Sequence, residues 1–198
     1  KFTPDEELAD FLLEQEVKLE QDHGAPYCPC QGRSGARDDD MKIVCPCIPF
    51  HRAHFDAIIA EHVHPDTALI VLTDGSNVLG AGDQGLGGMA LADATCAHYT
   101  LLGGMHPATT LPIMLDLGTD NLALLRDRAY LGWRHEHMRG PDLETFLRQV
   151  IASIHRHVPT AIIHWEGLAD TTTRVVLEHR DRSPRSIVSD VQGLGVTT

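Results

Sequence analysis

Short apolar runs that alternate with helical segments restrict the fold of this chain more than any other feature of its sequence. Four runs have the length and composition of buried strands: residues 68–72, 111–115, 160–164 and, more weakly, 186–189. Three segments between them show helical periodicity: residues 122–126, 143–157 and 171–179. Strands separated by helices are typical of parallel sheets, so the sequence predicts an α/β fold, a parallel sheet flanked by helices.

The beginning of the chain follows a different pattern. It carries cysteines in two closely spaced triplets, and residues 50–61 are expected to form a helix shortly before a junction around Pro65. We therefore expect two units. A small helical cysteine-bearing segment would cover residues 1–60, and the α/β domain would cover residues 61–198.

Charge and hydropathy argue against two classes of partner. The net charge of -12 argues against non-specific nucleic-acid binding, which needs a basic surface. No apolar run approaches the roughly 20 residues that a membrane helix requires, so no membrane is expected. The chain begins with neither Met nor an apolar leader. We therefore expect a cytoplasmic location and a fragment of a longer protein.

The motif GxGxxG occurs at residues 80–85, shortly after an apolar run. One interpretation is a dinucleotide-binding turn, in which glycines let the backbone approach a pyrophosphate. The sequence shows neither a second apolar strand nor an acidic residue at about 20 residues further on, as that turn requires. We therefore favour a glycine-rich turn in which backbone segments pass closely, and we assign no cofactor-binding residue.

Several ordered blocks resemble the N-terminal catalytic domain of malic enzymes. They begin with the stretch Thr-Asp-Gly-Ser-Asn and end with Ser-Asp-Val-Gln-Gly-Leu-Gly. The blocks are residues 73–89, 97–107, 111–121, 130–140, 163–169 and 189–195. The resemblance covers roughly residues 65–198, and it implies an α/β domain that here lacks the NAD-binding domain of the family.

The resemblance implies a chemistry that this chain only partly retains. The family decarboxylates malate, a small dicarboxylate, oxidatively with NAD(P) and Mg²⁺ or Mn²⁺. Glu166 matches its first metal ligand and Asp190 its third, whereas Gly167 stands where the second acid is expected. Thr95 replaces the catalytic lysine and Asn77 the substrate-binding arginine. The resemblance therefore implies residual binding of a divalent metal and impaired catalysis, with the catalytic residues unassigned.

The two Cys-Pro-Cys triplets belong to a second resemblance. Residues 5–56 resemble the catalytic subunit of ferredoxin–thioredoxin reductase, which holds a [4Fe–4S] cluster beside a redox-active disulfide. Carried over, Cys28, Cys45 and Cys47 would be iron–sulfur ligands, and Cys30 would be one half of the redox-active disulfide. Ferredoxin or thioredoxin would then be the partner.

The third cysteine pair of that family is missing, so three outcomes stay open. A degraded [4Fe–4S] site would take His51, His54 or an external thiol as its fourth ligand. A tetrahedral Zn²⁺ would be bound by all four triplet cysteines. The third outcome is that no metal binds. The remaining histidines of the 13 in the chain are interpreted as structural or solvated.

Three hypotheses for function follow. The first is a malic-enzyme-like oxidoreductase fragment that retains divalent-metal binding and is catalytically impaired alone. It predicts that NAD(P) is supplied by a partner chain or by further sequence, and a homo-oligomer is compatible with it. The second is an iron–sulfur protein that transfers electrons to disulfides, or a zinc-binding scaffold. The third is a relic without chemistry.

Overall fold

The computed structural model describes residues 48–127, 129–179 and 185–188. The chain divides into two units, Lys1–Ile58 and Ile59–Thr198, and helix α3 (Ile48–His62) runs across the division. The predicted helix at residues 50–61 is therefore present. The rest of the cysteine-bearing segment lies outside the described residues. The helices and strands that follow α3 belong to the second unit. None of the helices in the described part has the length and apolar composition needed to cross a membrane.

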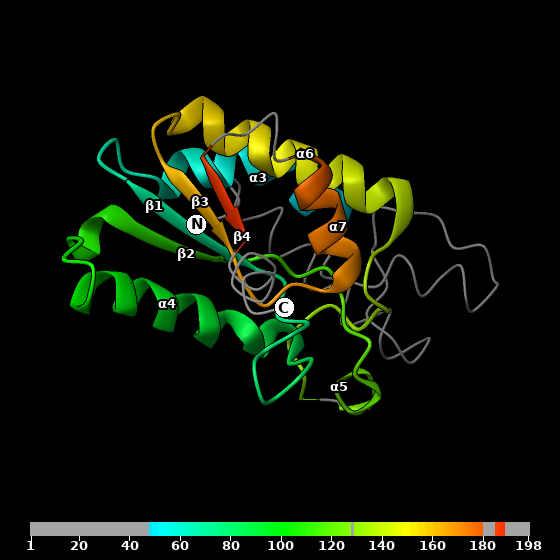
Figure 1. The fold of residues 1–198 in the computed structure, drawn as a ribbon. Coiled ribbons are helices and arrows are strands. Elements are labelled where there is room, and N and C mark those ends of the chain that lie inside the picture. Colours follow the sequence, from blue (N-terminus) through cyan, green and yellow to red (C-terminus); the bar gives the residue numbers. More distant parts are fainter. Residues whose placement is uncertain (1–47, 128, 180–184, 189–198) are drawn as a thin grey trace, which may run out of the picture. The chain divides into compact units, whose positions relative to one another are not determined.

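The second unit is built on a parallel sheet with the strand order β2-β1-β3-β4 (Figure 1). Its strands are β1 (Leu69–Thr73), β2 (Thr110–Met114), β3 (Ile162–Trp165) and β4 (Ser186–Val188). Every neighbouring pair runs parallel. The predicted fold class is confirmed, and each strand forms at or next to its expected position.

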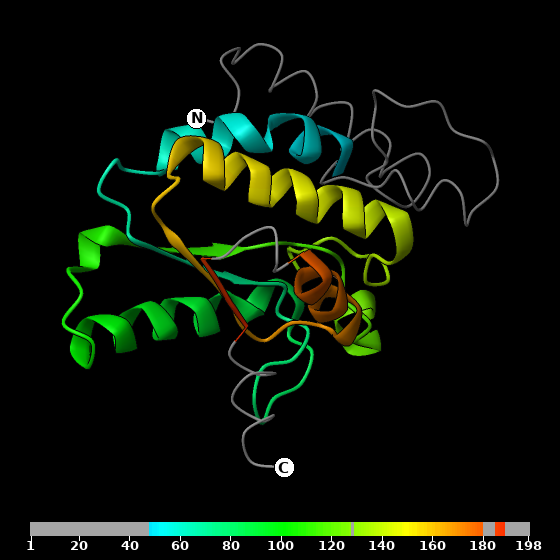
Figure 2. The same ribbon diagram turned by 45° about the horizontal axis from the view of Figure 1, so that its top comes forward.

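Helices connect consecutive strands and cover both faces of the sheet. They are α4 (Met89–Leu101), the short α5 (Leu122–Arg126), α6 (Gly140–His157) and α7 (Asp170–His179). Helix α6 lies on one face and α4 on the opposite face (Figures 1 and 2). Helix α7 contacts α6. This layering of helix, sheet and helix explains why the central strands β1 and β3 read as short apolar runs, since both of their faces are covered. The edge strands β2 and β4 are largely half-buried.

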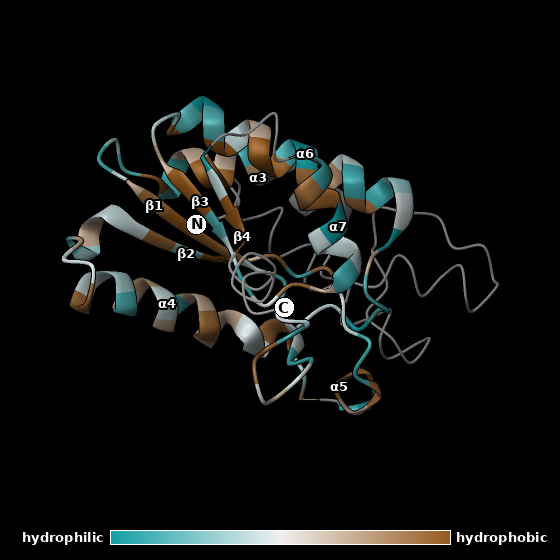
Figure 3. Cartoon of the chain, viewed as in Figure 1, coloured by the Kyte–Doolittle hydropathy of each residue, from teal (hydrophilic) through white to brown (hydrophobic). Residues whose placement is uncertain are grey.

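The hydrophobic core is centred on β1, whose five residues are all buried. On one side, α6 contributes a buried stripe at helical spacing, formed by Leu143, Leu147, Val150 and Ile154. Figure 3 shows β1 as strongly hydrophobic and α6 as alternating between hydrophobic and hydrophilic residues. A helix of this pattern is held mainly by the burial of its apolar face.

Helix α4 was not predicted from periodicity. Its sequence, MALADATCAHYTL, places apolar residues around most of the helix, so no single face stands out. Only the tertiary structure selects a buried side: Ala92 and Cys96 pack against Leu69 and Val71 of β1. Thr95, between them in the helix, is buried as well.

Close backbone contacts hold the start of α4 against the turn that follows β1. Gly75 has a φ of +69°, and a Cβ added there would lie 2.1 Å from the Gly85 carbonyl oxygen. A Cβ at Gly88 would lie 2.3 Å from the Gly75 Cα. Gly80 and Gly82 of the GxGxxG motif are different, because their added Cβ atoms would meet nothing within 4 Å. The predicted close passage therefore holds for the end of the motif and not for its beginning.

Gly88→Ala is expected to lower the free energy of unfolding by about 1–3 kcal/mol, the usual cost of overpacking. The added methyl would meet the backbone of Gly75, which has no flexible side chain that can move aside. Gly87→Ala is the matched control, since its Cβ would come no closer than 3.9 Å to another atom. Urea denaturation of both variants checks this, and equal stabilities would contradict the close packing.

Candidate functional site

The turns that follow β1 and β3 meet at one edge of the sheet. Leu72 pairs with Trp165 in the parallel register, and the Glu166 N–H donates to the Leu72 carbonyl oxygen (2.9 Å). The turn after β1 reaches the same place, because the Asn77 N–H donates to the Gly167 carbonyl oxygen (3.0 Å). Open parallel sheets bind ligands outside the carboxyl ends of their strands. This edge is therefore the candidate functional site.

A buried carboxylate, Asp74, connects the segments that meet at this edge. It is fully buried and accepts hydrogen bonds from the Thr172 hydroxyl (2.6 Å) and the Ser76 N–H (3.0 Å). The Ala169 N–H lies 3.2 Å from both of its oxygens. The His137 Nε2 lies 3.1 Å from Asp74 Oδ2. Asp74 thus ties together three segments that are far apart in the sequence.

The surroundings of His137 favour its charged form. Its Nδ1 lies 2.9 Å from the Met138 carbonyl oxygen and its Nε2 faces Asp74. Both ring nitrogens face acceptors, which favours the imidazolium form, in which each nitrogen carries a hydrogen. Burial alone lowers the pKa of His137, but the hydrogen bond and charge of Asp74 outweigh it and the net shift is upward. Burial raises the pKa of Asp74, yet bonds from His137 and Thr172 leave it lowered.

The pair makes stability depend on pH in two directions. Because the pKa of Asp74 is lowered, its contribution is lost as the pH falls through the folded-state pKa. Because the pKa of His137 is raised, its contribution is complete below the unfolded-state value of about 6.5 and is lost as the pH rises through the folded-state pKa. We expect His137→Gln to destabilise the protein more at pH 6 than at pH 10, measured by urea denaturation.

The control for this experiment is His64→Gln, because the His64 side chain is 68% exposed. That variant should stay close to the wild type at both pH values. If the destabilisation by His137→Gln were the same at pH 6 and pH 10, the ion pair would not be the source of the pH dependence.

Glu166 is a carboxylate at this edge of the sheet. It follows β3 directly, is partly exposed, and its Oε2 accepts a hydrogen bond from the Thr95 hydroxyl of α4. One turn further along α4, the Tyr99 ring meets the His164 ring edge to face, with centroids 5.6 Å apart. Residues 164 and 166 lie on the same face of β3 and its extension. Two contacts therefore connect α4 to this part of the sheet.

Gly167 has a backbone conformation that disfavours the acid expected at its position. Its φ is +64°, and an added Cβ would lie 2.5 Å from Leu91 Cδ2. Side chains other than glycine are strained in this left-handed region. An aspartate at position 167 would be strained in its backbone, and the Leu91 side chain would have to move.

Comparison with known proteins identifies the family. The model of the malic enzyme N-terminal domain matches residues 47–180. The chain belongs to the malic enzyme family. A model of the ferredoxin thioredoxin reductase catalytic beta chain matches residues 1–70. Both resemblances inferred from the sequence are thereby confirmed.

The similar malic enzymes are much longer than this chain. The NAD-dependent malic enzymes of Vibrio campbellii and Shewanella sediminis are each 37% identical over 148 residues, which is 75% of this chain and 26% of theirs. NAD-dependent malic enzyme 2 of Photobacterium profundum is 38% identical over 141 residues, 71% of this chain and 25% of its own. The chain spans about a quarter of the length of these relatives.

Thr95, Asn77 and Gly167, which the resemblance named as replaced positions, lie with Glu166 at the same edge of the sheet. Of the predicted site residues themselves, the structure describes Glu166. The others lie outside the described residues: Asp190, Cys28, Cys30, Cys45 and Cys47. In the part of the chain that the structure describes, no group of three or more His, Cys, Asp or Glu side chains is arranged to hold a metal ion.

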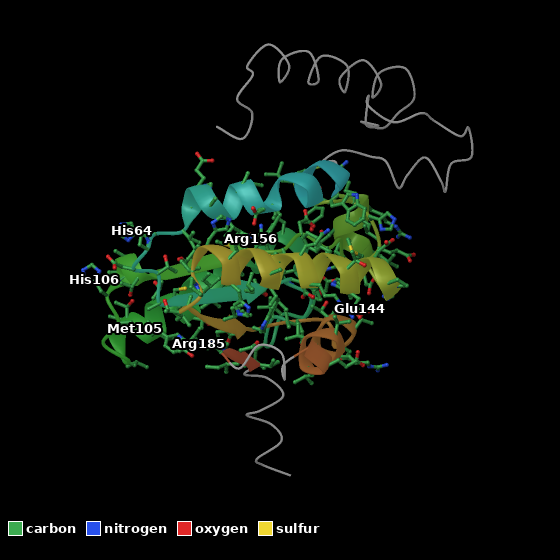
Figure 4. The ribbon with its side chains drawn as sticks, turned by 90° about the horizontal axis from the view of Figure 1, so that it is seen from above. His64, Met105, His106, Glu144, Arg156 and Arg185 are labelled. Carbon is green, nitrogen blue, oxygen red and sulfur yellow. The ribbon has the colours of Figure 1, made fainter. Side chains whose placement is uncertain are left out.

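Three described histidines have clear surroundings. His137 belongs to the buried ion pair. His64 and His106 are exposed on loops ahead of β1 and β2 (Figure 4), and each accepts a hydrogen bond from the backbone two residues on. The side chains of His51 and His54, named as alternative ligands, are outside the description.

Sequence reasoning missed the carboxylates that hold the long irregular segment between β2 and α6. Asp83 accepts from the Asp120 N–H (2.7 Å), and Asp116 accepts from the Trp133 N–H (2.6 Å). Asp120 in turn accepts from the His137 N–H (3.1 Å). Aspartates that follow glycines or strands were visible in the sequence as turn formers, but their distant partners were not.

Proposed function

We propose that the second unit binds a divalent cation together with a small dicarboxylate at the β1–β3 edge, as a malic-enzyme-like fragment with impaired catalysis alone. The observation that carries the proposal is the position of Glu166. It is placed directly after β3, beside the turn that follows β1, and its Oε1 makes no hydrogen bond to the described residues. By family resemblance this residue corresponds to a metal ligand.

The donor set suits Mg²⁺ or Mn²⁺, which prefer oxygen ligands. Glu166 supplies one carboxylate within the described residues, and Gly167 supplies no side chain. Asp190 is proposed as a second protein ligand, and a bound dicarboxylate would add further oxygens. A cation held there would polarise the substrate oxygens and stabilise enolate charge.

Turnover is proposed to be impaired because two side chains that handle protons and substrate charge are replaced. Thr95 occupies the lysine position and donates its hydroxyl to Glu166. Asn77 occupies the arginine position and offers an amide in place of a positive charge. A general acid or base contributes about 10²–10⁴ in rate. NAD(P) would be supplied by a nucleotide-binding domain on a partner chain or on further sequence, and a homo-oligomer is part of the same proposal.

Mn²⁺ binding tests this proposal directly. The wild-type chain is expected to bind Mn²⁺, and Glu166→Gln is expected to weaken that binding at least about tenfold, since even outer-shell changes cost 10–100-fold. Free Mn²⁺ can be measured by electron paramagnetic resonance, with and without malate. Glu144→Gln on α6 (Figure 4) is the matched control, because it removes the charge of a glutamate that pairs with Arg148 of its own helix.

Two outcomes would contradict the proposal. One is Mn²⁺ binding that is equal in the wild type and in Glu166→Gln. The other is robust NAD(P)-linked oxidation of malate by the isolated chain, which would show that the replaced side chains are not needed.

A second candidate function rests on the first unit. The match of residues 1–70 to the ferredoxin thioredoxin reductase model includes both Cys-Pro-Cys triplets. We propose this segment as a site for a [4Fe–4S] cluster or for Zn²⁺, with Cys28, Cys45 and Cys47 as ligands and Cys30 as a further ligand or the redox-active thiol. Ferredoxin or thioredoxin would be the partner of the cluster form.

Anaerobic purification with metal analysis and a visible spectrum separates these forms. A cluster gives a brown protein with broad absorbance around 400 nm, and zinc gives a colourless protein with about one Zn²⁺ per chain, as a four-thiolate site binds. Either signal should be lost in Cys45→Ser. Cys96→Ser is the control, because Cys96 is buried in the second unit. A protein without iron or zinc would contradict this candidate.

A further inference from the structure

The hydroxyl of Thr95 contacts Glu166, the candidate cation ligand. The family resemblance, which has a lysine at this position, does not predict that contact. A threonine inside a helix often bonds back to a carbonyl of the preceding turn. Here the Thr95 hydroxyl instead donates across to Glu166 Oε2. The contact joins two elements that are 71 positions apart in the sequence.

Both partners of this contact are fixed by their surroundings. Thr95 is 8% exposed, and its helix is anchored beside it by Cys96, which packs into the core. Glu166 is fixed through its backbone, because its N–H continues the β1–β3 ladder to Leu72. The hydroxyl therefore meets a carboxylate whose backbone has little freedom to move.

The contact leaves the two carboxylate oxygens unequal. Oε2 is engaged by Thr95, whereas Oε1 makes no hydrogen bond to any residue in the described ranges. With Oε2 bonded to Thr95, the orientation of the carboxylate is fixed and Oε1 is the oxygen that can bind a cation. Hydrogen bonds to a ligating carboxylate orient it and strengthen metal binding.

We propose that Thr95 is a positioning residue for a divalent cation, which holds the Glu166 carboxylate so that Oε1 points to the metal. This inference rests on the proposed cation binding by Glu166. It gives Thr95, at the position of the family's catalytic lysine, a role in metal binding. Glu166 would then be an oriented metal ligand even though that lysine is absent. Thr95 itself would not touch the cation.

The test is Mn²⁺ affinity, measured by electron paramagnetic resonance on the full chain. Thr95→Val keeps the shape and removes the hydroxyl, and it is expected to weaken Mn²⁺ binding about 10- to 100-fold. Thr95→Ser keeps the hydroxyl and is expected to bind as the wild type does. Thr100→Val removes a hydroxyl from the same helix that makes no hydrogen bond to Glu166, and it should leave the affinity unchanged. Thermal melting of each variant reports whether the fold is retained.

The outcomes separate this inference from the proposed function. If Glu166→Gln loses Mn²⁺ while Thr95→Val binds as the wild type does, the positioning role is wrong and cation binding by Glu166 stands. If Thr95→Ser is as weak as Thr95→Val, the hydroxyl is not the cause and the inference is overturned. If the wild type binds no Mn²⁺, or Glu166→Gln binds equally well, both fail.

Discussion

The buried ion pair between Asp74 and His137 is the constraint on which the rest of the site depends. Asp74 closes β1, and its carboxylate accepts hydrogen bonds from the turn after β1, from α7 through Thr172, and from the backbone of Ala169. A fully buried charge is tolerated only when it is paired and hydrogen-bonded. Breaking such a pair by removing one partner costs about 3–5 kcal/mol. The same carboxylate therefore stabilises the domain and fixes the two turns that form the site.

Backbone contacts, as well as side chains, determine the shape of the site. Gly75 and Gly88 let the start of α4 approach the end of β1, and this approach places Thr95 within reach of Glu166. Gly167 occupies a left-handed turn whose carbonyl accepts from the Asn77 N–H. Backbone contacts and buried groups therefore fix the shape of this edge of the sheet.

Much of the fold was predictable from the sequence, while the contacts of the site were not. The strands appeared as apolar runs, since a strand covered on both faces must be apolar throughout. Helix α6 appeared through its one-sided apolar pattern, whereas α4 did not, since its apolar residues are spread around the helix. Glu166 was named as a candidate ligand through family resemblance, which stays a prediction. Its partner Thr95 was recognised only as a replacement, because a hydrogen bond across 71 positions leaves no local pattern.

The sequence by itself determined the class of fold and the family. These properties are carried by local composition and by the order of short motifs, so they can be read along the chain. The tertiary structure alone decided that His137 lies against the buried carboxylate of Asp74 and that the Thr95 hydroxyl donates a hydrogen bond to Glu166. Such interactions arise only when parallel strands bring the ends of distant segments to one edge, where burial makes each polar group find a partner.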